Sequence, residues 1–118
     1  MFDIHSHVLP GLDDGPTRIQ ESLEMMRSAQ RAGVRAIVAT PHCESHRLSL
    51  RTSVIEGAVI RLRAAAADDP EASSVALHVG SEMMLDPGVR AALDAGDVPT
   101  LGGNTRFALV ELPMRWVP

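Results

Sequence analysis

The chain lacks lysine, disulfide partners and long apolar runs. All 11 basic residues are arginines, which removes lysine from every catalytic role. The single cysteine, Cys43, excludes an internal disulfide and fits a reducing compartment. No apolar run approaches the roughly 18 residues of a membrane span, and no charged-then-apolar leader opens the sequence. We therefore expect a cytoplasmic protein without a membrane span.

An excess of positive charge is also missing. The formal net charge is -4, so the chain offers no basic field for nucleic acid or for an anionic membrane. Its 118 residues, 45% of them hydrophobic, suffice for one modest core but not for two ordinary domains. We expect one domain over residues 1–118.

Strand and helix patterns alternate along the sequence. Thr17 and Gln20 have the spacing of a capping box, Gly33 is placed to end the first helix, and Asp86 can cap the last one. About four strands alternating with helices predict an α/β fold with a parallel sheet, open or curled into a barrel. The predicted strands are 1–7, 34–40, 75–79 and 107–112, and the predicted helices are 17–33, 51–67 and 86–96.

Two histidines at the end of the first predicted strand carry the strongest chemical signal. Side chains at positions i and i+2 of a strand leave the same face, so His5 and His7 can hold one ion together. Imidazole suits zinc, manganese and iron. Asp3 shares this face, and we expect it to support a histidine or form an ion pair rather than bind metal. A metal site is the leading hypothesis, and incidental histidines on a half-buried strand are the alternative.

Further polar residues follow the other predicted strands. His42, Glu82 and Glu111 each lie at or just past a strand's carboxyl end, where parallel α/β folds build their active sites. Glu111 interrupts an apolar strand and needs a cation, either a metal or a nearby arginine. His42 alone would suit a turn after a proline. Asp13 and Asp14 are typical turn residues, and one of them is a better candidate ligand than both.

Other polar residues receive smaller roles. His46 and Arg47 lie in a predicted loop, where they can meet an anionic substrate or simply be solvated. His78 lies inside a predicted strand and is interpreted as a packed or surface residue. A thiol phosphatase needs an arginine six positions after its cysteine to bind phosphate. Here Ser49 stands six positions after Cys43, so the sequence argues against catalysis by this thiol.

The motifs together resemble a known family. They are Asp3-Ile4-His5-Ser6-His7, Leu9-Pro10-Gly11-Leu12-Asp13-Asp14-Gly15-Pro16, Glu21-Ser22, Ala36-Ile37-Val38-Ala39-Thr40-Pro41-His42, Gly80-Ser81-Glu82 and Leu109-Val110-Glu111-Leu112-Pro113. In this order they are similar to the bacterial tyrosine phosphatases of the polymerase and histidinol phosphatase (PHP) superfamily. The closest resemblance is to the members of capsular and exopolysaccharide biosynthesis.

The resemblance implies the first part of a distorted, TIM-like PHP barrel with up to three divalent ions. Manganese is the expected metal, with iron or zinc as alternatives. The resemblance assigns His5, His7 and Glu82 to the first ion, Glu82 and Glu111 to the second, and Asp14 and His42 to the third. His5, His7 and Glu82 would act in catalysis through the bound metal and its water.

The implied activity is metal-dependent hydrolysis of a phosphate monoester, with a phosphotyrosine protein as substrate. A bacterial tyrosine kinase controlling polysaccharide export is the expected partner. A histidinol-phosphate phosphatase and a non-catalytic metal-binding or interaction module are the alternatives. Many amidohydrolases also begin with His-x-His, but they bridge two metals through a carboxylated lysine, and this chain has no lysine.

Chain length is where the sequence departs from the family. Family members are roughly twice as long, so we expect a truncated chain that lacks the C-terminal half. Such a chain would leave a sheet edge and an apolar face uncovered. Both surfaces favour association, including the formation of homo-oligomers.

Overall fold

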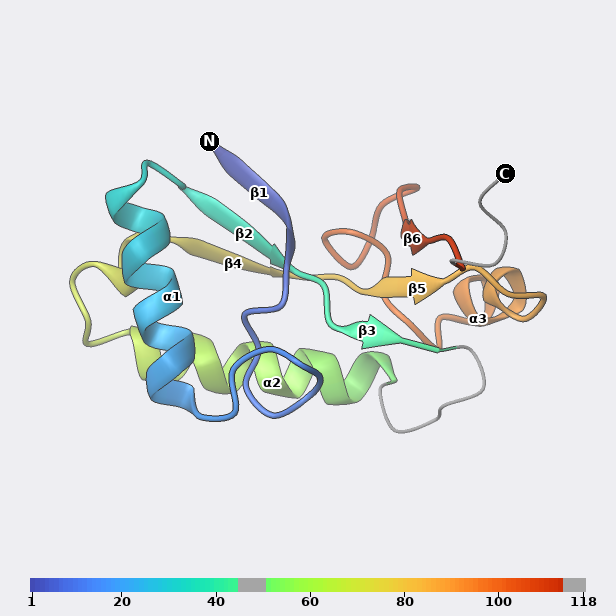
Figure 1. The fold of residues 1–118 in the computed structure, drawn as a ribbon, viewed down its shortest axis with the longest axis horizontal. Helices are drawn as coiled ribbons and strands as arrows, with labels where there is room; N and C mark the ends of the chain where they lie inside the picture. Colours follow the sequence, from blue (N-terminus) through green and yellow to red (C-terminus); the bar gives the residue numbers. More distant parts are fainter. Residues whose placement is uncertain (45–50, 114–118) are drawn as a thin grey trace.

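The structure is a computed structural model that describes residues 1–44 and 51–113, and it contains two parallel sheets (Figure 1). The first sheet has the strand order β1-β2-β4 and the second has the order β3-β5-β6. The strands are β1 (Phe2–Ser6), β2 (Ala36–Ala39), β3 (His42–Cys43), β4 (Ala76–Val79), β5 (Glu82–Met84) and β6 (Leu109–Glu111). The expected α/β class with parallel strands is confirmed. Within the described ranges neither sheet closes on itself, so a barrel stays a prediction.

The helices are α1 (Ile19–Arg31), α2 (Thr52–Ala66) and α3 (Val89–Ala95), with a short 3-10 helix η2 (Ala72–Ser74). Helix α2 contacts both α1 and β4. Its buried residues recur every three or four positions, which is the spacing that puts side chains on one helical face. These residues are Ile55, Ala58, Val59, Leu62 and Ala66. They join Met26 of α1 and Ile37 of β2 in the core.

Two predicted strands, 34–40 and 75–79, are present as β2 and β4, and each is followed after a short break by a strand that the sequence did not predict. After β2 the chain passes through Thr40 and Pro41 and then resumes as β3, and β4 resumes as β5 in the same way. Proline has no N–H for the sheet ladder, which explains the first break. At the second break Gly80 approaches its neighbour closely, since a Cβ there would lie 2.7 Å from Cγ1 of Val38. His42 therefore lies just past the end of β2, as predicted, and is also the first residue of β3.

Helix ends agree with the sequence only in part. Helix α1 ends at Arg31, and Gly33 follows with φ +88°, as expected of a residue that stops a helix. The predicted capping box is wrong: Arg18 occupies the N-cap position, and the Thr17 hydroxyl donates to Glu21 instead. The Thr17 hydroxyl thus bonds to a side chain in the first turn of α1 and not to a backbone N–H of that turn.

The last helix is shorter than predicted. Gly88 is its N-cap residue, and Asp86 accepts a hydrogen bond from the Gly88 N–H. Asp86 thus stabilises the turn that precedes the helix. Gly96 ends the helix in the left-handed conformation, as expected.

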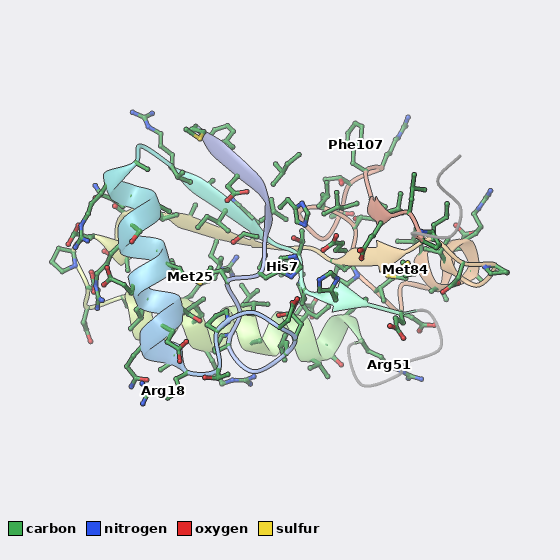
Figure 2. The ribbon with its side chains drawn as sticks, in the orientation of Figure 1. His7, Arg18, Met25, Arg51, Met84 and Phe107 are labelled. Carbon is green, nitrogen blue, oxygen red and sulfur yellow. The ribbon has the colours of Figure 1, made fainter. Side chains whose placement is uncertain are left out.

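Large apolar side chains remain exposed beside β1 and β6. Phe2 and Ile4 lie on β1, an edge strand of its sheet, and Phe107 and Leu112 flank β6. Phe107 is labelled in Figure 2. These side chains are exposed apolar surface at the two strands. None of the helices within residues 1–44 and 51–113 has the length and hydropathy of a membrane span.

Candidate metal centre

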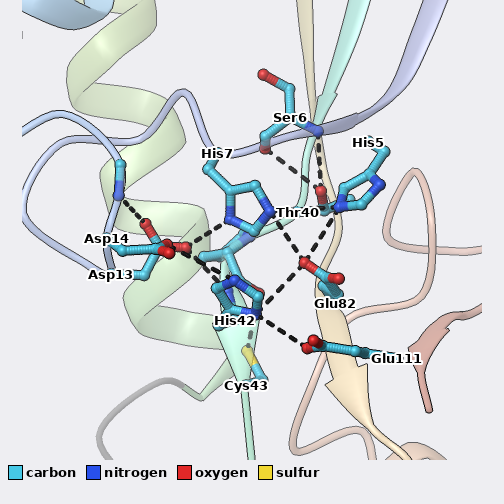
Figure 3. Close-up of polar contacts among 12 residues, drawn as sticks. His5, Ser6, His7, Asp13, Asp14, Thr40, His42, Cys43, Glu82 and Glu111 are labelled. Atoms are coloured by element: carbon cyan, nitrogen blue, oxygen red, sulfur yellow. Dashed lines mark hydrogen bonds and ion pairs between the residues drawn. The ribbon is translucent and has the colours of Figure 1, made fainter. Parts of the chain in front are cut away.

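Imidazoles and carboxylates from four strands meet at the junction between the two sheets (Figure 3). His5 lies near the end of β1, and His7 follows directly after this strand. His42 comes from the start of β3, Glu82 from the start of β5 and Glu111 from the end of β6. His42 and Glu82 are register partners in the second sheet. Parallel pairing thus brings together residues that are far apart in sequence.

One carboxylate oxygen forms the middle of this cluster. Oε2 of Glu82 lies 2.9 Å from Nε2 of His7, 3.1 Å from Nε2 of His5 and 3.4 Å from Nδ1 of His42. The Glu82 side chain is only 9% exposed. A carboxylate removed from water in this way needs a cation beside it, either protonated imidazole or metal.

The spacing of these atoms suits a divalent ion. Two donors about 2.1 Å from one ion, at angles of roughly 90–110°, lie about 3.0–3.4 Å apart. Nε2 of His5 and Nε2 of His7 are 3.3 Å apart, and both are near Glu82. Imidazole nitrogen and carboxylate oxygen are ligands for zinc, manganese and iron. The donor set therefore fits a divalent metal ion.

Among residues 1–44 and 51–113, three overlapping groups of side chains have the donor spacing of a candidate metal site. Their members are His5, His7 and Glu82; then His42, Glu82 and Glu111; and then His7, Asp13, Asp14 and His42. All six residues of the predicted ligand set fall in these groups. Within them, Nδ1 of His42 lies 3.5 Å from Glu111, and its Nε2 lies 3.6 Å from Asp14.

The two adjacent aspartates differ sharply in environment. The Asp14 side chain is 80% exposed and faces His42. The Asp13 side chain is 6% exposed, and its carboxylate contacts His7 and the backbone N–H groups of Gly15 and His42. Sequence reasoning left the role of Asp13 open. The available signal was the Asp-x-Gly spacing, since an aspartate often accepts the N–H two residues ahead in a turn.

Electrostatics couple His7 to Asp13. Burial disfavours protonated His7, but the hydrogen bond with Asp13 and the charges of Asp13, Glu82 and Asp14 outweigh it and raise the pKa of His7. Burial likewise opposes ionised Asp13. Its hydrogen bonds from His7, His42 and Gly15 outweigh that effect and lower the pKa of Asp13. Asp13 is therefore held ionised beside the cluster.

Asp3, Cys43 and His78 are not members of these groups. Asp3 accepts a hydrogen bond from the backbone N–H of His5, which supports that strand without touching the imidazole. His78 is exposed on β4, which agrees with the prediction that it is either a packed or a surface residue. Burial, together with the charge of Asp13, raises the pKa of the Cys43 thiol to about 12. His46 and Arg47 fall outside the described residues.

A parallel α/β scaffold with imidazoles and carboxylates gathered at its strand junction defines the class: an α/β protein with a candidate metal centre. Comparison with known proteins gives the particular family. Residues 1–115 match the family model described as "Capsular polysaccharide synthesis, CpsB/CapC". The chain belongs to the CpsB/CapC family.

Individual relatives agree with this assignment. The chain is 32% identical over 120 residues to the tyrosine-protein phosphatase YwqE of Bacillus subtilis, covering 100% of this chain and 45% of the relative. It is 33% identical over 117 residues to the tyrosine-protein phosphatase CpsB of Streptococcus agalactiae, covering 98% and 46%. The chain thus spans about half the length of the curated relatives it matches.

A solved structure shares the fold. It comes from the crystal structures of YwqE from Bacillus subtilis and CpsB from Streptococcus pneumoniae, described as unique metal-dependent tyrosine phosphatases. The TM-score is 0.85 at 30% sequence identity, over 96% of this chain and 44% of the other.

Proposed function

We propose that residues 1–118 belong to a single domain of a metal-dependent protein-tyrosine phosphatase that acts in capsular or exopolysaccharide biosynthesis. The observation that carries this proposal is the approach of three imidazole nitrogens within 3.4 Å of one buried oxygen of Glu82. Family membership and the printed activities of the relatives support the choice of reaction.

The proposed ligands are His5, His7, Glu82, Glu111, Asp14 and His42. The first three would hold one ion, Glu82 would also serve a second ion with Glu111, and Asp14 and His42 would hold a third. Manganese is the proposed metal, and iron and zinc share the same donor preferences. Divalent ions bound to these residues would acidify water and offset negative charge on a phosphoryl group.

Residues of this chain would orient the metal ligands and leave one side of the cluster open to substrate. Glu82 and the neighbouring backbone hold His5 and His7 so that their Nε2 atoms face a common point. On the outer side of the cluster, the side chains of Asp14 and Glu111 are 80% and 42% exposed. An open outer side suits a phosphate carried by a bulky protein. The proposed substrate is accordingly a phosphotyrosine protein, with a bacterial tyrosine kinase as the partner.

The proposed setting follows from the same family. A barrel that includes both sheets is the proposed complete fold, supported by the TM-score of 0.85 to the solved relative. The proposed location is the cytoplasm, because a single cysteine fits a reducing compartment.

The test measures bound metal and phosphatase activity on the same chain. Protein stripped with a chelator and reloaded with Mn²⁺ should bind the ion and hydrolyse a phosphotyrosine peptide faster than histidinol phosphate. His5→Ala and His7→Ala should lose both properties. His78→Ala is the matched control, because His78 is an exposed histidine on β4, and it should keep both.

Each outcome has a distinct meaning. Faster turnover of histidinol phosphate would replace the proposed substrate by the small phosphate ester. Bound manganese without turnover of either substrate would instead support a metal-binding module. Absence of both metal and turnover would contradict the proposal altogether.

A further inference from the structure

Asp13 is positioned between two of the proposed ligands. Its Oδ2 lies 2.7 Å from Nδ1 of His7 and accepts a hydrogen bond of 3.0 Å from the backbone N–H of His42. Its Oδ1 accepts the backbone N–H of Gly15 at 2.9 Å. The carboxylate therefore links the loop after β1 to both histidines.

These bonds leave Asp13 little capacity to bind a metal ion. A carboxylate has about four lone-pair sites, and three of them are directed at N–H groups here. Asp13 is also nearly buried, whereas its neighbour Asp14 is largely exposed beside His42. Of the two aspartates, Asp14 is the one free to bind a cation.

The loop is closely fitted around this contact. A Cβ at Gly15 would lie 2.3 Å from the carbonyl oxygen of His7 and 3.1 Å from Oδ1 of Asp13. Only glycine allows the backbone to come so near His7. The Asp-Asp-Gly turn thus holds the Asp13 carboxylate directly against the His7 ring.

This contact determines which His7 nitrogen can bind metal. Ionised carboxylate only accepts hydrogen bonds, so Nδ1 of His7 must carry the proton that is shared with Asp13. In the neutral ring the lone pair is then on Nε2, which lies 2.9 Å from Glu82 and 3.3 Å from Nε2 of His5. A protonated Nδ1 cannot bind an ion, so Nε2 is the nitrogen that His7 offers to a metal.

We propose that Asp13 is a positioning residue that fixes the tautomer and orientation of His7 and thereby commits His7 to the ion shared with His5 and Glu82. This inference rests on the metal centre of the proposed function. Carboxylates that orient a metal-binding histidine typically change metal affinity by about 10–100-fold when they are removed.

The first measurement reads the tautomer without metal. ¹⁵N NMR of the metal-free chain, at a pH where the ring is neutral, should show His7 protonated on Nδ1 and bare on Nε2. Asp13→Ala should give a mixture of tautomers. Asp13→Asn should preserve the wild-type tautomer, because the amide oxygen can still accept from Nδ1. A wild-type His7 with the proton on Nε2 would overturn the inference even if no variant folded.

The second measurement is the affinity for Zn²⁺ by calorimetry. Asp13→Ala should bind about 10–100-fold more weakly than wild type, and Asp13→Asn should recover most of that loss. Asp68→Asn, in the exposed turn after α2, is the matched control and should bind as wild type does. Equal and severe losses in both Asp13 variants would make Asp13 a ligand and overturn its positioning role.

The two readouts separate this inference from the proposed function. A wild-type chain that binds no Zn²⁺ would contradict the metal centre and, with it, the commitment of His7 to an ion. Wild-type binding that is unchanged in Asp13→Ala would contradict only the role of Asp13.

Discussion

Thr40 bonds to Ser6, the residue between the two candidate histidine ligands, through both its backbone and its side chain. The Thr40 N–H donates to the carbonyl of Ser6 at 2.7 Å, and the N–H of Ser6 donates to Oγ1 of Thr40 at 2.9 Å. The pairing of β1 with β2 shifts register between Asp3 and Ser6. The buried hydroxyl thus completes the ladder where the strand pairing is irregular, and it holds the backbone from which His5 and His7 project.

Replacing Thr40 by valine should therefore weaken both the fold and the metal centre. Valine keeps the shape but leaves the Ser6 N–H without its acceptor, at a cost of about 1–3 kcal/mol. Thr40→Ser keeps the hydroxyl and should recover most of that stability. Urea denaturation and Zn²⁺ calorimetry measure the two effects. Equal behaviour of the valine and serine variants would show that the hydroxyl has no positioning role.

Gly80 should be intolerant of a side chain. A Cβ there would lie 2.7 Å from Cγ1 of Val38 and 3.1 Å from the carbonyl oxygen of Ala39, so Gly80→Ala must displace β2 or β4. We expect a loss of about 1–3 kcal/mol in the free energy of unfolding, as for other overpacked sites.

Gly57→Ala is the matched control for this substitution. Gly57 lies within α2, where the nearest atom to a new Cβ is the flexible end of Arg61 at 3.4 Å. Alanine in a helix interior should add about 0.5–1 kcal/mol of stability. Comparable denaturation midpoints for the two variants would contradict the close approach at Gly80.

The sequence predicted the parts of the site that follow from local pattern. The strand period predicted a common direction for His5 and His7, and both imidazoles face Glu82 although His7 lies just past the end of β1. Glu82 and Glu111 stood out because a charged residue follows or interrupts an apolar strand. The family resemblance added the preference for Asp14, which the turn pattern alone left open.

Contacts between distant segments could not be predicted in this way. The Thr40 hydroxyl meets Ser6 only because β1 and β2 pair with a shifted register. The interruptions that make His42 and Glu82 the first residues of new strands also depend on how the neighbouring strands approach at Gly80. The apolar pattern of a sequence locates a strand, but it does not show where the pairing of two strands breaks or shifts register.

Glu82 should matter more for metal binding than Glu111. A ligand present at a hundred times its dissociation constant stabilises a protein by about 2.7 kcal/mol, so added Mn²⁺ should raise the melting temperature. Glu82→Gln should abolish this rise, because its carboxylate meets three imidazoles and is 9% exposed. Glu111→Gln, at a side chain 42% exposed, should only reduce it. A larger effect of Glu111→Gln in thermal melts would contradict the central position of Glu82.

Cys43 should be unreactive in the folded chain. Its thiol is buried, and burial with the nearby Asp13 charge raises its pKa to about 12. Because the thiolate is the reactive form, a disulfide reagent at mildly alkaline pH should label native protein much more slowly than unfolded protein. Labelling kinetics with and without denaturant measure this ratio. Rapid labelling of the native chain would reopen a role for the thiol.

Asp69 should make folding sensitive to acid. It accepts hydrogen bonds from the backbone N–H of Ala72 at 3.0 Å and from Nε of Arg27 at 2.7 Å, and these contacts lower its pKa below the ordinary value of 3.8. A lowered folded-state pKa adds stability that is present above the unfolded value and is lost as pH falls through the folded one. The melting temperature of wild type should therefore exceed that of Asp69→Asn near neutral pH, and the difference should shrink below pH 3.8.

Asp68→Asn, which changes the exposed neighbouring residue, is the control for this prediction and should melt as wild type does at every pH. Thermal melts between neutral pH and pH values below 3.8 measure this difference. A difference in melting temperature between wild type and Asp69→Asn that did not change with pH would show that ionised Asp69 does not cause the acid sensitivity.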